Sequence, residues 1–174
     1  MVRWSVRLAG ESEQRGAVLR SLYRTVVMKR ELSRKAKLSI YRSIFVPTLT
    51  YGHEGWVMTE RKRSRIQAAE ISFLRRVAGF SLRDRVRSSV IREELGLEPL
   101  LLCLERSQLR WFGHLARPVG RRPRGRPRTR WRDYISTLAW ERLGIPPSEL
   151  VNVAREREVW GPLLELLPPR PDPG

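Results

Sequence analysis

The sequence predicts an all-α fold, an irregular helical bundle with an extended Arg/Pro/Gly linker and disordered termini. Apolar residues recur at three- and four-residue spacing along most of the chain, which is typical of helices that pack on one side. No stretch of five or more residues alternates apolar and polar side chains cleanly enough to indicate a strand. Hydrophobic residues make up 41% of the 174, which is enough to build a core.

The N-terminal part predicts two helices after a poorly ordered start. Residues 1–16 show no clear period, so we expect them to be poorly ordered, whereas the apolar spacing of residues 17–29 fits a helix. Ser33 is a good N-cap for a second helix that runs to Phe45. Pro47 should break or kink that helix, because proline lacks the N–H that the helix needs.

A third helix is predicted between Thr59, as its cap, and Ala78, with Gly79 ending it. At about 100° per residue its side chains divide into an apolar arc and a basic one. The apolar arc contains Ile66, Phe73, Leu74 and Val77, and the basic arc contains Arg61, Arg65, Arg75 and Arg76. A short helix should follow Ser88 and end at Gly96.

The clearest helical pattern covers residues 99–117, with Pro99 at a position that suits the first turn. Its apolar face should hold Leu100, Leu101, Leu104, Trp111, Phe112 and Leu115, and its back should present Arg106, Arg110 and Arg117. We interpret Trp111, Trp131, Trp140 and Trp160 as core residues rather than base-stacking platforms, because each falls on or beside an apolar helical face.

Prolines and glycines set off the C-terminal part from the helical region over residues 17–117. Residues 118–128 read as a basic Arg/Pro/Gly linker, and residues 129–166 as a C-terminal helical segment. Within that segment one helix should run from a Thr129 cap to Gly144, and a last one should run through about residue 160. Residues 167–174 are proline-rich and should form an extended, mobile tail.

Charge is the strongest functional signal. The formal net charge is +17, and residues 121–132 alone carry seven arginines and no acid. Arginine suits bidentate phosphate contacts, so the sequence predicts DNA and/or RNA as partner. The candidate nucleic-acid-binding residues are Arg121, Arg122, Arg124, Arg126, Arg128, Arg130 and Arg132, together with Arg106, Arg110 and Arg117 of the preceding helix.

The linker allows three interpretations. Residues 124–127 read Arg-Gly-Arg-Pro and resemble an AT-hook, in which arginines enter the narrow, negative minor groove of A·T-rich DNA. The same arginines could clamp phosphates without regard to sequence, which we favour, or simply form a solvated linker.

The sequence contains no pattern that is typical of a catalytic site or a metal site. The only aspartates, Asp84, Asp133 and Asp172, stand apart from one another in the sequence. Cys103 and His114 would lie about 16 Å apart along one helix, too far to act together. We therefore expect no catalytic residue, no metal and no cofactor. The longest apolar run, residues 100–104, is too short to span a membrane, so we expect an intracellular protein, nuclear or cytoplasmic.

Several motifs occur in a specific order. They read KLSIYRSIFVPTLTYGHEGW over residues 37–56, FLRRVAG over 73–79, RDRVR over 83–87, LRWFGHLAR over 109–117 and TRWRD over 129–133. This succession resembles the region that follows the catalytic palm in non-LTR (LINE-type) retrotransposon reverse transcriptases, and vertebrate, fish-like elements most of all.

The resemblance implies a thumb and post-thumb portion that helps to hold the template–primer duplex. It also implies no catalysis here, because the family's polymerase needs palm aspartates that these motifs do not include. Three alternatives remain open: a helical module that docks on a protein partner through apolar helix faces, a decayed element product without function, and, least favoured, an active RNA-directed DNA polymerase.

Overall fold

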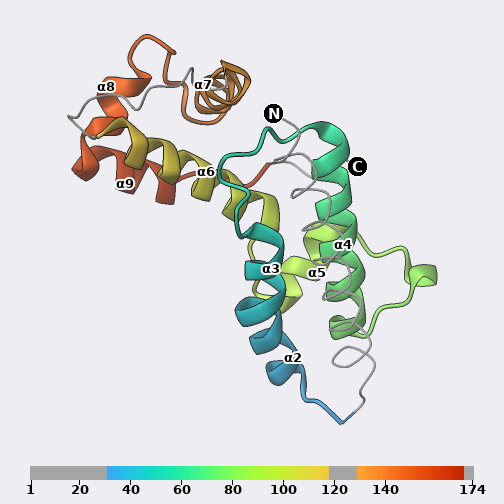
Figure 1. The fold of residues 1–174 in the computed structure, drawn as a ribbon. Helices are drawn as coiled ribbons and strands as arrows, with labels where there is room; N and C mark the ends of the chain where they lie inside the picture. The colour runs from blue at the N-terminus through green and yellow to red at the C-terminus, as the bar shows by residue number, and fades with distance from the viewer. Residues whose placement is uncertain (1–30, 118–128, 171–174) are drawn as a thin grey trace, which may run out of the picture. The chain divides into compact units, whose positions relative to one another are not determined.

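A computed structural model describes residues 31–117 and 129–170 (Figure 1). All regular elements within these ranges are helical, which confirms the predicted all-α class. The helix expected over residues 17–29, the start at 1–16, the linker at 118–128 and the last four residues of the tail lie outside the described residues.

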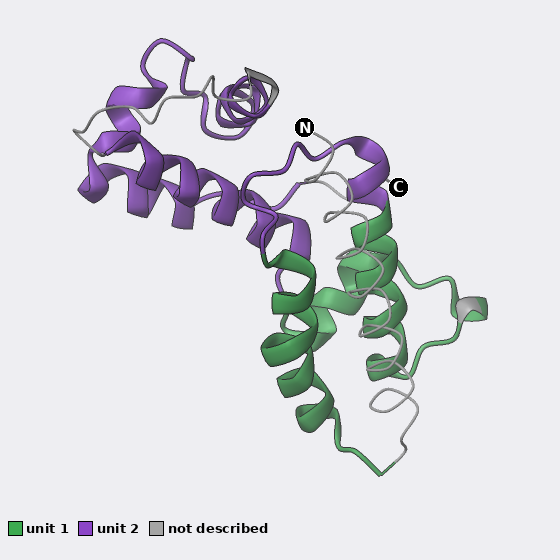
Figure 2. Cartoon of the chain, viewed as in Figure 1, with its two compact units in different colours: residues 1–51, 65–97 green, residues 52–64, 98–174 purple. Residues whose placement is uncertain are grey.

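The chain divides into two compact units (Figure 2). Unit 1 comprises Met1–Tyr51 and Arg65–Leu97, and unit 2 comprises Gly52–Ser64 and Glu98–Gly174. The predicted helical region of residues 17–117 is therefore shared between the units.

Unit 1 begins with α2 (Arg34–Ile40), which Ser33 caps as predicted, its Oγ accepting from the Ala36 N–H at 3.2 Å. The helix was expected to end at Phe45, before Pro47. Instead it widens into a π-helix, η2 (Tyr41–Phe45), and continues as α3 (Val46–Thr50), in which proline occupies the first turn. A wider turn accommodates a residue that cannot donate a backbone hydrogen bond.

The next helices have the predicted bounds. α4 spans Glu60–Ala78, its first turn lying in unit 2, and Gly79 follows it with a φ of +86°. A 3-10 turn, η3 (Leu82–Asp84), precedes α5 (Ser88–Leu95), which ends at Gly96 in the left-handed conformation. Glycine suits these helix ends because it has no Cβ and adopts positive φ without the strain that other residues would have.

The core of unit 1 combines aromatic packing with a buried ion pair. The rings of Tyr41, Phe45 and Phe73 lie 4.7 to 5.5 Å apart. Glu70 is fully buried beside them, where it accepts from the Tyr41 hydroxyl at 3.2 Å and from Arg92 at 3.0 Å. A buried carboxylate needs such partners to offset the loss of its hydration.

Unit 2 contains α6 (Leu100–Ala116), α7 (Thr129–Leu143), α8 (Leu150–Arg155) and α9 (Arg157–Glu165). The single last helix that the sequence predicted is in fact two, because the backbone breaks at Glu156, whose ψ is 94°. In one straight helix Ala154 and Trp160 would point about 120° apart. The break allows both side chains to be buried in the same core.

The core of unit 2 lies between these four helices. Its buried residues are Leu102, Leu109, Phe112, Ile135, Leu138, Ala139, Leu150, Ala154, Trp160, Leu164 and Leu167. The expected mobile tail thus begins with a core residue, since Leu167 is only 2% exposed. Arg170, three residues on, is bound to Glu105 of α6 at 2.8 Å.

Candidate nucleic-acid interface

The predicted arginines fall into three groups in the structure. Arg121, Arg122, Arg124, Arg126 and Arg128 lie outside the described residues. The backbone of Arg130 belongs to the first turn of α7, and the Arg132 side chain is exposed on the same helix. Arg106, Arg110 and Arg117 are on α6.

Arg106 is occupied by contacts within the chain. Its guanidinium binds the Glu98 carboxylate at 2.7 Å and donates to three backbone carbonyls, of Leu164, Glu165 and Leu167, at 3.1 to 3.4 Å. These bonds tie the end of α9 to α6. We therefore assign Arg106 a structural role and leave it out of the proposed interface.

Arg110 and Arg117, in contrast, line a groove between α6 and α9. The two helices run antiparallel, since Arg106 bonds the end of α9, the Trp160 indole N–H donates to the Leu109 carbonyl at 3.1 Å, and Arg155 bonds the Ala116 carbonyl. The groove has a volume of about 630 Å³. Its lining residues are Glu54, Ser107, Arg110, Trp111, His114, Arg117, Arg157, Trp160, Gly161, Leu164 and Glu165.

The arginines of this groove have no partners within the described parts of the chain. Neither a hydrogen bond nor an ion pair joins Arg110, Arg117 or Arg157 to another residue in ranges 31–117 and 129–170. The Nε of Arg117 is buried and unsatisfied.

Tryptophan exposure differs from the sequence-based expectation. Trp160 is buried, as predicted, but Trp111 is 42% and Trp140 is 56% exposed. Trp131 is half-buried and donates its indole N–H to the Glu54 carbonyl at 2.9 Å. The expectation that all four belong to the core is therefore wrong for Trp111 and Trp140. Leu115, predicted on the apolar face, is 50% exposed.

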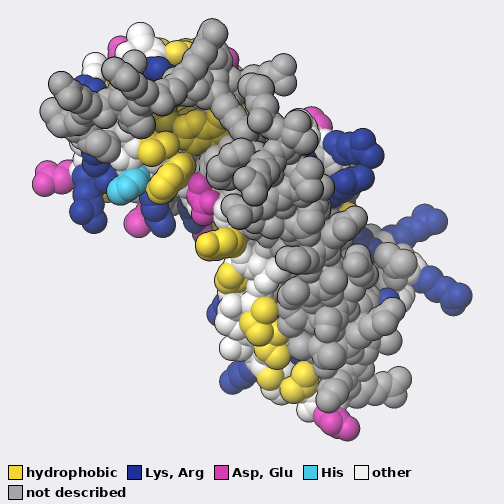
Figure 3. Space-filling model, viewed as in Figure 1, with side chains coloured by type: hydrophobic (Ala, Val, Ile, Leu, Met, Phe, Trp, Pro, Cys, Tyr) yellow, Lys and Arg dark blue, Asp and Glu magenta, His cyan; other side chains and the backbone are white. Residues whose placement is uncertain are grey.

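The ring of His114 stacks on that of Trp111. The two ring centroids lie 5.4 Å apart at an interplanar angle of 26°, and His114 is exposed. Histidine, basic and hydrophobic side chains accordingly lie next to one another on the visible face of unit 2 (Figure 3). A partly exposed indole beside free arginines is a typical surface for stacking a planar base.

A buried glutamine that sequence reasoning missed holds one wall of the site. The Gln108 Nε2 donates to the carbonyls of His53 and Trp56 at 2.9 and 2.8 Å, and its Oε1 accepts from the Tyr134 hydroxyl at 2.8 Å. Gln108 is fully buried. The two bonds to His53 and Trp56 position the loop that contains Glu54, a residue of the groove, and the third ties Gln108 to α7.

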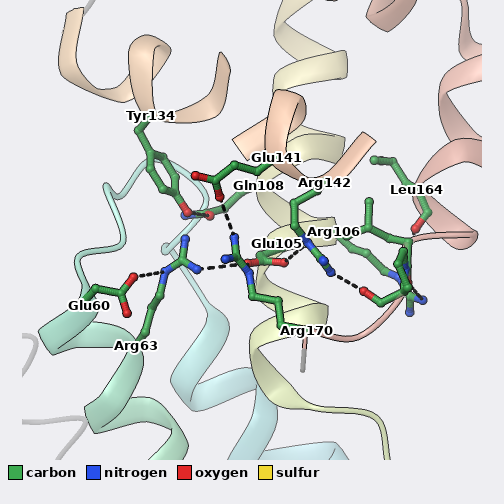
Figure 4. A network of polar contacts seen from close by, with 12 residues as sticks. Glu60, Arg63, Glu105, Arg106, Gln108, Tyr134, Glu141, Arg142, Leu164 and Arg170 are labelled. Carbon is green, nitrogen blue, oxygen red and sulfur yellow. Dashed lines mark hydrogen bonds and ion pairs between the residues drawn. The ribbon is translucent and has the colours of Figure 1, made fainter. Parts of the chain in front are cut away.

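A buried carboxylate, also missed, gathers three arginines around itself (Figure 4). Glu105 is 4% exposed and pairs with Arg63 at 3.4 Å, Arg142 at 2.9 Å and Arg170 at 2.8 Å. The sequence did carry a signal for Glu105 and Gln108, since each is a polar residue next to leucines of α6. A polar side chain in such a place predicts burial together with hydrogen-bond partners.

These charges affect nearby titrations. Burial raises the pKa of the Tyr134 phenol above its ordinary value of 10.0, although the positive charge of Arg63 opposes the shift. For Arg170, burial lowers the pKa, but the Glu105 and Glu141 carboxylates outweigh it and raise the pKa overall. Arg170 therefore remains charged and stays bound to its carboxylates.

The described residues contain no group of three or more His, Cys, Asp or Glu side chains that could hold a metal ion. Asp84 serves as a helix cap, accepting from the Ser81 N–H, and Asp133 is exposed on α7. None of the helices in ranges 31–117 and 129–170 combines the length and apolar character that a bilayer span needs.

Comparison with known proteins finds a relative that is similar over part of the chain. Over 89 residues the chain is 30% identical to a Caenorhabditis elegans protein described as transposon-derived. The match covers 48% of this chain and 32% of the relative, so the matched segment corresponds to about a third of that protein. No family model matches the chain, and no solved structure matches it. The similarity supports a transposon-related origin.

Proposed function

We propose that this chain is a non-catalytic nucleic-acid-binding segment derived from a non-LTR retrotransposon reverse transcriptase, and that it holds template–primer or other duplex through arginine–phosphate contacts. Two observations support the origin: the similarity to a transposon-derived protein and the order of motifs along the sequence. DNA and RNA both present the phosphates that this mode of binding requires.

The observation that carries the binding proposal is the placement of the seven-arginine tract. The tract, residues 121–132, begins in the segment that joins α6 to α7 and ends in the first turn of α7, and both helices belong to unit 2. Arg117 precedes the tract, and Arg132 lies at its end, exposed on α7. Neither is bonded to another residue of the described ranges, so both can contact phosphate without breaking an existing ion pair.

The charge of unit 2 is used in two different ways. Arg63, Arg142 and Arg170 are bound to Glu105 and stabilise the fold. Arg110, Arg117, Arg132 and Arg157 have no such partner within ranges 31–117 and 129–170. This separation supports a binding surface, because arginines held in buried ion pairs cannot contact phosphate without breaking those pairs, whereas the unpaired ones can.

The aspartates support a non-catalytic role. Polymerase chemistry needs carboxylates that converge on divalent cations. The Asp84 carboxylate accepts the Ser81 N–H in a capping box, and Asp133 is exposed at the start of α7. A primer-extension assay on the purified chain should therefore give no product, whereas extension would overturn this part of the proposal.

Binding can be tested with a tract variant and a control of equal charge. The tract variant carries glutamine in place of Arg121, Arg122, Arg124 and Arg126. The control carries glutamine in place of four arginines that are exposed on α4 and around η3: Arg61, Arg65, Arg83 and Arg87. Both lose four charges, so a difference between them reports position rather than net charge.

Affinity for a labelled template–primer duplex should fall much further in the tract variant than in the control. A loss of equal size in both would show that net charge alone attracts the duplex, and it would reject the tract as a site. An unchanged affinity in the tract variant would reject it as well.

A further inference from the structure

We infer that the groove between α6 and α9 binds an unpaired nucleotide of a single strand, with its base stacked on Trp111 and its phosphate held by Arg117 and Arg157. The inference deepens the proposed function and rests on it. It assigns to this groove a ligand different from the duplex proposed for the tract.

The cations of the groove concentrate at one end. Arg157 is the first residue of α9 and Arg117 directly follows α6, and because the helices are antiparallel these two ends lie at the same end of the groove. Both line it. Arg110 is two turns before Arg117, about 10 Å away on the same side of α6. Arg117 and Arg157 thus place two positive charges at one end of the groove, where an anion would be attracted.

The carboxylates limit what the groove can hold. Glu165 lies eight residues after Arg157, about 12 Å further along α9, and Glu54 also lines the groove. A duplex laid along the full length would bring phosphates close to Glu165 and be repelled. A single nucleotide with its phosphate at the Arg117 end avoids this repulsion, and its base is then directed toward the aromatic part.

That aromatic part is held rigidly. Trp160 forms the floor, with its indole N–H bonded to the Leu109 carbonyl and its ring against Gly113. Trp111 also lines the groove, His114 stacks on its ring, and 42% of the Trp111 surface is exposed. Base–aromatic stacking does not depend on sequence, because every base offers a π-face.

An acidic protein segment is the other ligand that arginines could attract. The nucleotide is favoured because Arg117, which lines the groove, lies only four residues before Arg121 in the sequence, where the tract proposed to bind nucleic acid begins. An exposed indole also gives a base more contact area than it gives a carboxylate.

The test compares Trp111→Ala with Trp140→Ala in the full chain. Trp140 is exposed as well but lies on α7, outside the groove. Two labelled probes are titrated, a single-stranded oligothymidylate and a blunt duplex of mixed sequence. Trp111→Ala should weaken single-strand binding about 5- to 150-fold, the loss of one stacked base, and should change duplex binding less than about twofold. Trp140→Ala should change neither, and Trp111→Phe should retain most single-strand affinity.

A second pair of variants tests the phosphate end. Replacing Arg117 and Arg157 with glutamine should reduce the salt dependence on single strands by about 0.7 for each lost phosphate contact. The control replaces Arg61 and Arg65, which are exposed on α4, and should leave the slope unchanged.

The outcomes separate this inference from the proposed function. If wild-type protein binds the duplex but Trp111→Ala retains full single-strand affinity, the groove assignment is wrong while the proposed function stands. Equal losses on single strand and duplex would also reject it. If wild-type protein binds neither probe in dilute buffer, the proposed function itself fails. Groove-dependent binding of a polyglutamate peptide, with single strands unaffected, would assign the groove to an acidic protein partner.

Discussion

Trp160 packs so closely on Gly113 that a Cβ added at this glycine would lie 2.4 Å from the indole Nε1. The same indole N–H donates to the Leu109 carbonyl, one turn earlier in α6. The glycine is therefore needed for contact between two helices rather than for backbone freedom. This contact sets the floor of the α6–α9 groove and explains the glycine within the motif of residues 109–117.

Gly113→Ala should destabilise the protein by about 1–3 kcal/mol, because the extra methyl must displace a buried indole. Gly161→Ala is a matched control, since Gly161 also lies inside a helix but a Cβ there meets nothing within 4 Å. The control should be neutral or gain up to about 1 kcal/mol from helix propensity. Urea unfolding measures both, and equal stability of the two variants would contradict the close packing.

Glu105→Gln should cost about 3–5 kcal/mol, because it leaves Arg63, Arg142 and Arg170 around an uncharged amide in a buried site. Glu141→Gln is the control. Glu141 binds only the Arg170 end of the cluster and is half exposed, so its loss should cost less than about 1 kcal/mol. Thermal unfolding measures both variants. If Glu105→Gln and Glu141→Gln unfold at the same temperature, the proposed role of Glu105 is wrong.

Tyr134 should make the protein less stable in alkali. Since its pKa is raised in the folded state, mainly by burial, the unfolded chain loses the phenol proton first as pH rises. The stabilisation is complete below pH 10 and is lost as pH rises from about 10 through the folded-state pKa.

Tyr134→Phe should remove this alkaline component. The variant should also be about 1–3 kcal/mol less stable at neutral pH, because the Gln108 Oε1 loses its donor. Urea midpoints at about pH 8 and about pH 10.5 measure both effects. If the variant loses as much stability in alkali as the wild type, another group is responsible.

Variants of residues 124–127 can distinguish insertion of an AT-hook into the minor groove from a clamp on phosphates that ignores sequence. If the tract clamps phosphates, Arg124→Ala with Arg126→Ala should weaken A·T-rich and G·C-rich duplexes by the same factor. Competition binding with the two duplexes measures this ratio. A loss confined to A·T-rich DNA would instead establish minor-groove insertion.

The sequence predicted those helices whose ends carry strong local signals. α4 and α5 end at glycines with positive φ, and α2 starts at a serine that caps it, so local chemistry determines these boundaries. The continuation through Pro47 and the break at Glu156 depend on how neighbouring residues are buried, which local patterns do not encode.

The candidate site was predictable only in part. Spacing alone placed Arg106, Arg110 and Arg117 on one side of α6, but it could not reveal that Arg106 is occupied by the end of α9, 58 residues away in the chain. Trp111 fits an apolar stripe by position, yet no helix of the described ranges covers it fully. Tertiary neighbours decide which arginines and tryptophans remain available.

The most direct measurement is the salt dependence of binding to a template–primer duplex. Each phosphate neutralised by arginine should add about −0.9 to the slope of log affinity against log salt, so full engagement of residues 121–132 predicts a slope of about −6. Tight binding in dilute buffer with such a slope is the expected result. A slope near zero, or no binding at low salt, would contradict the claim that this chain holds nucleic acid through its arginines.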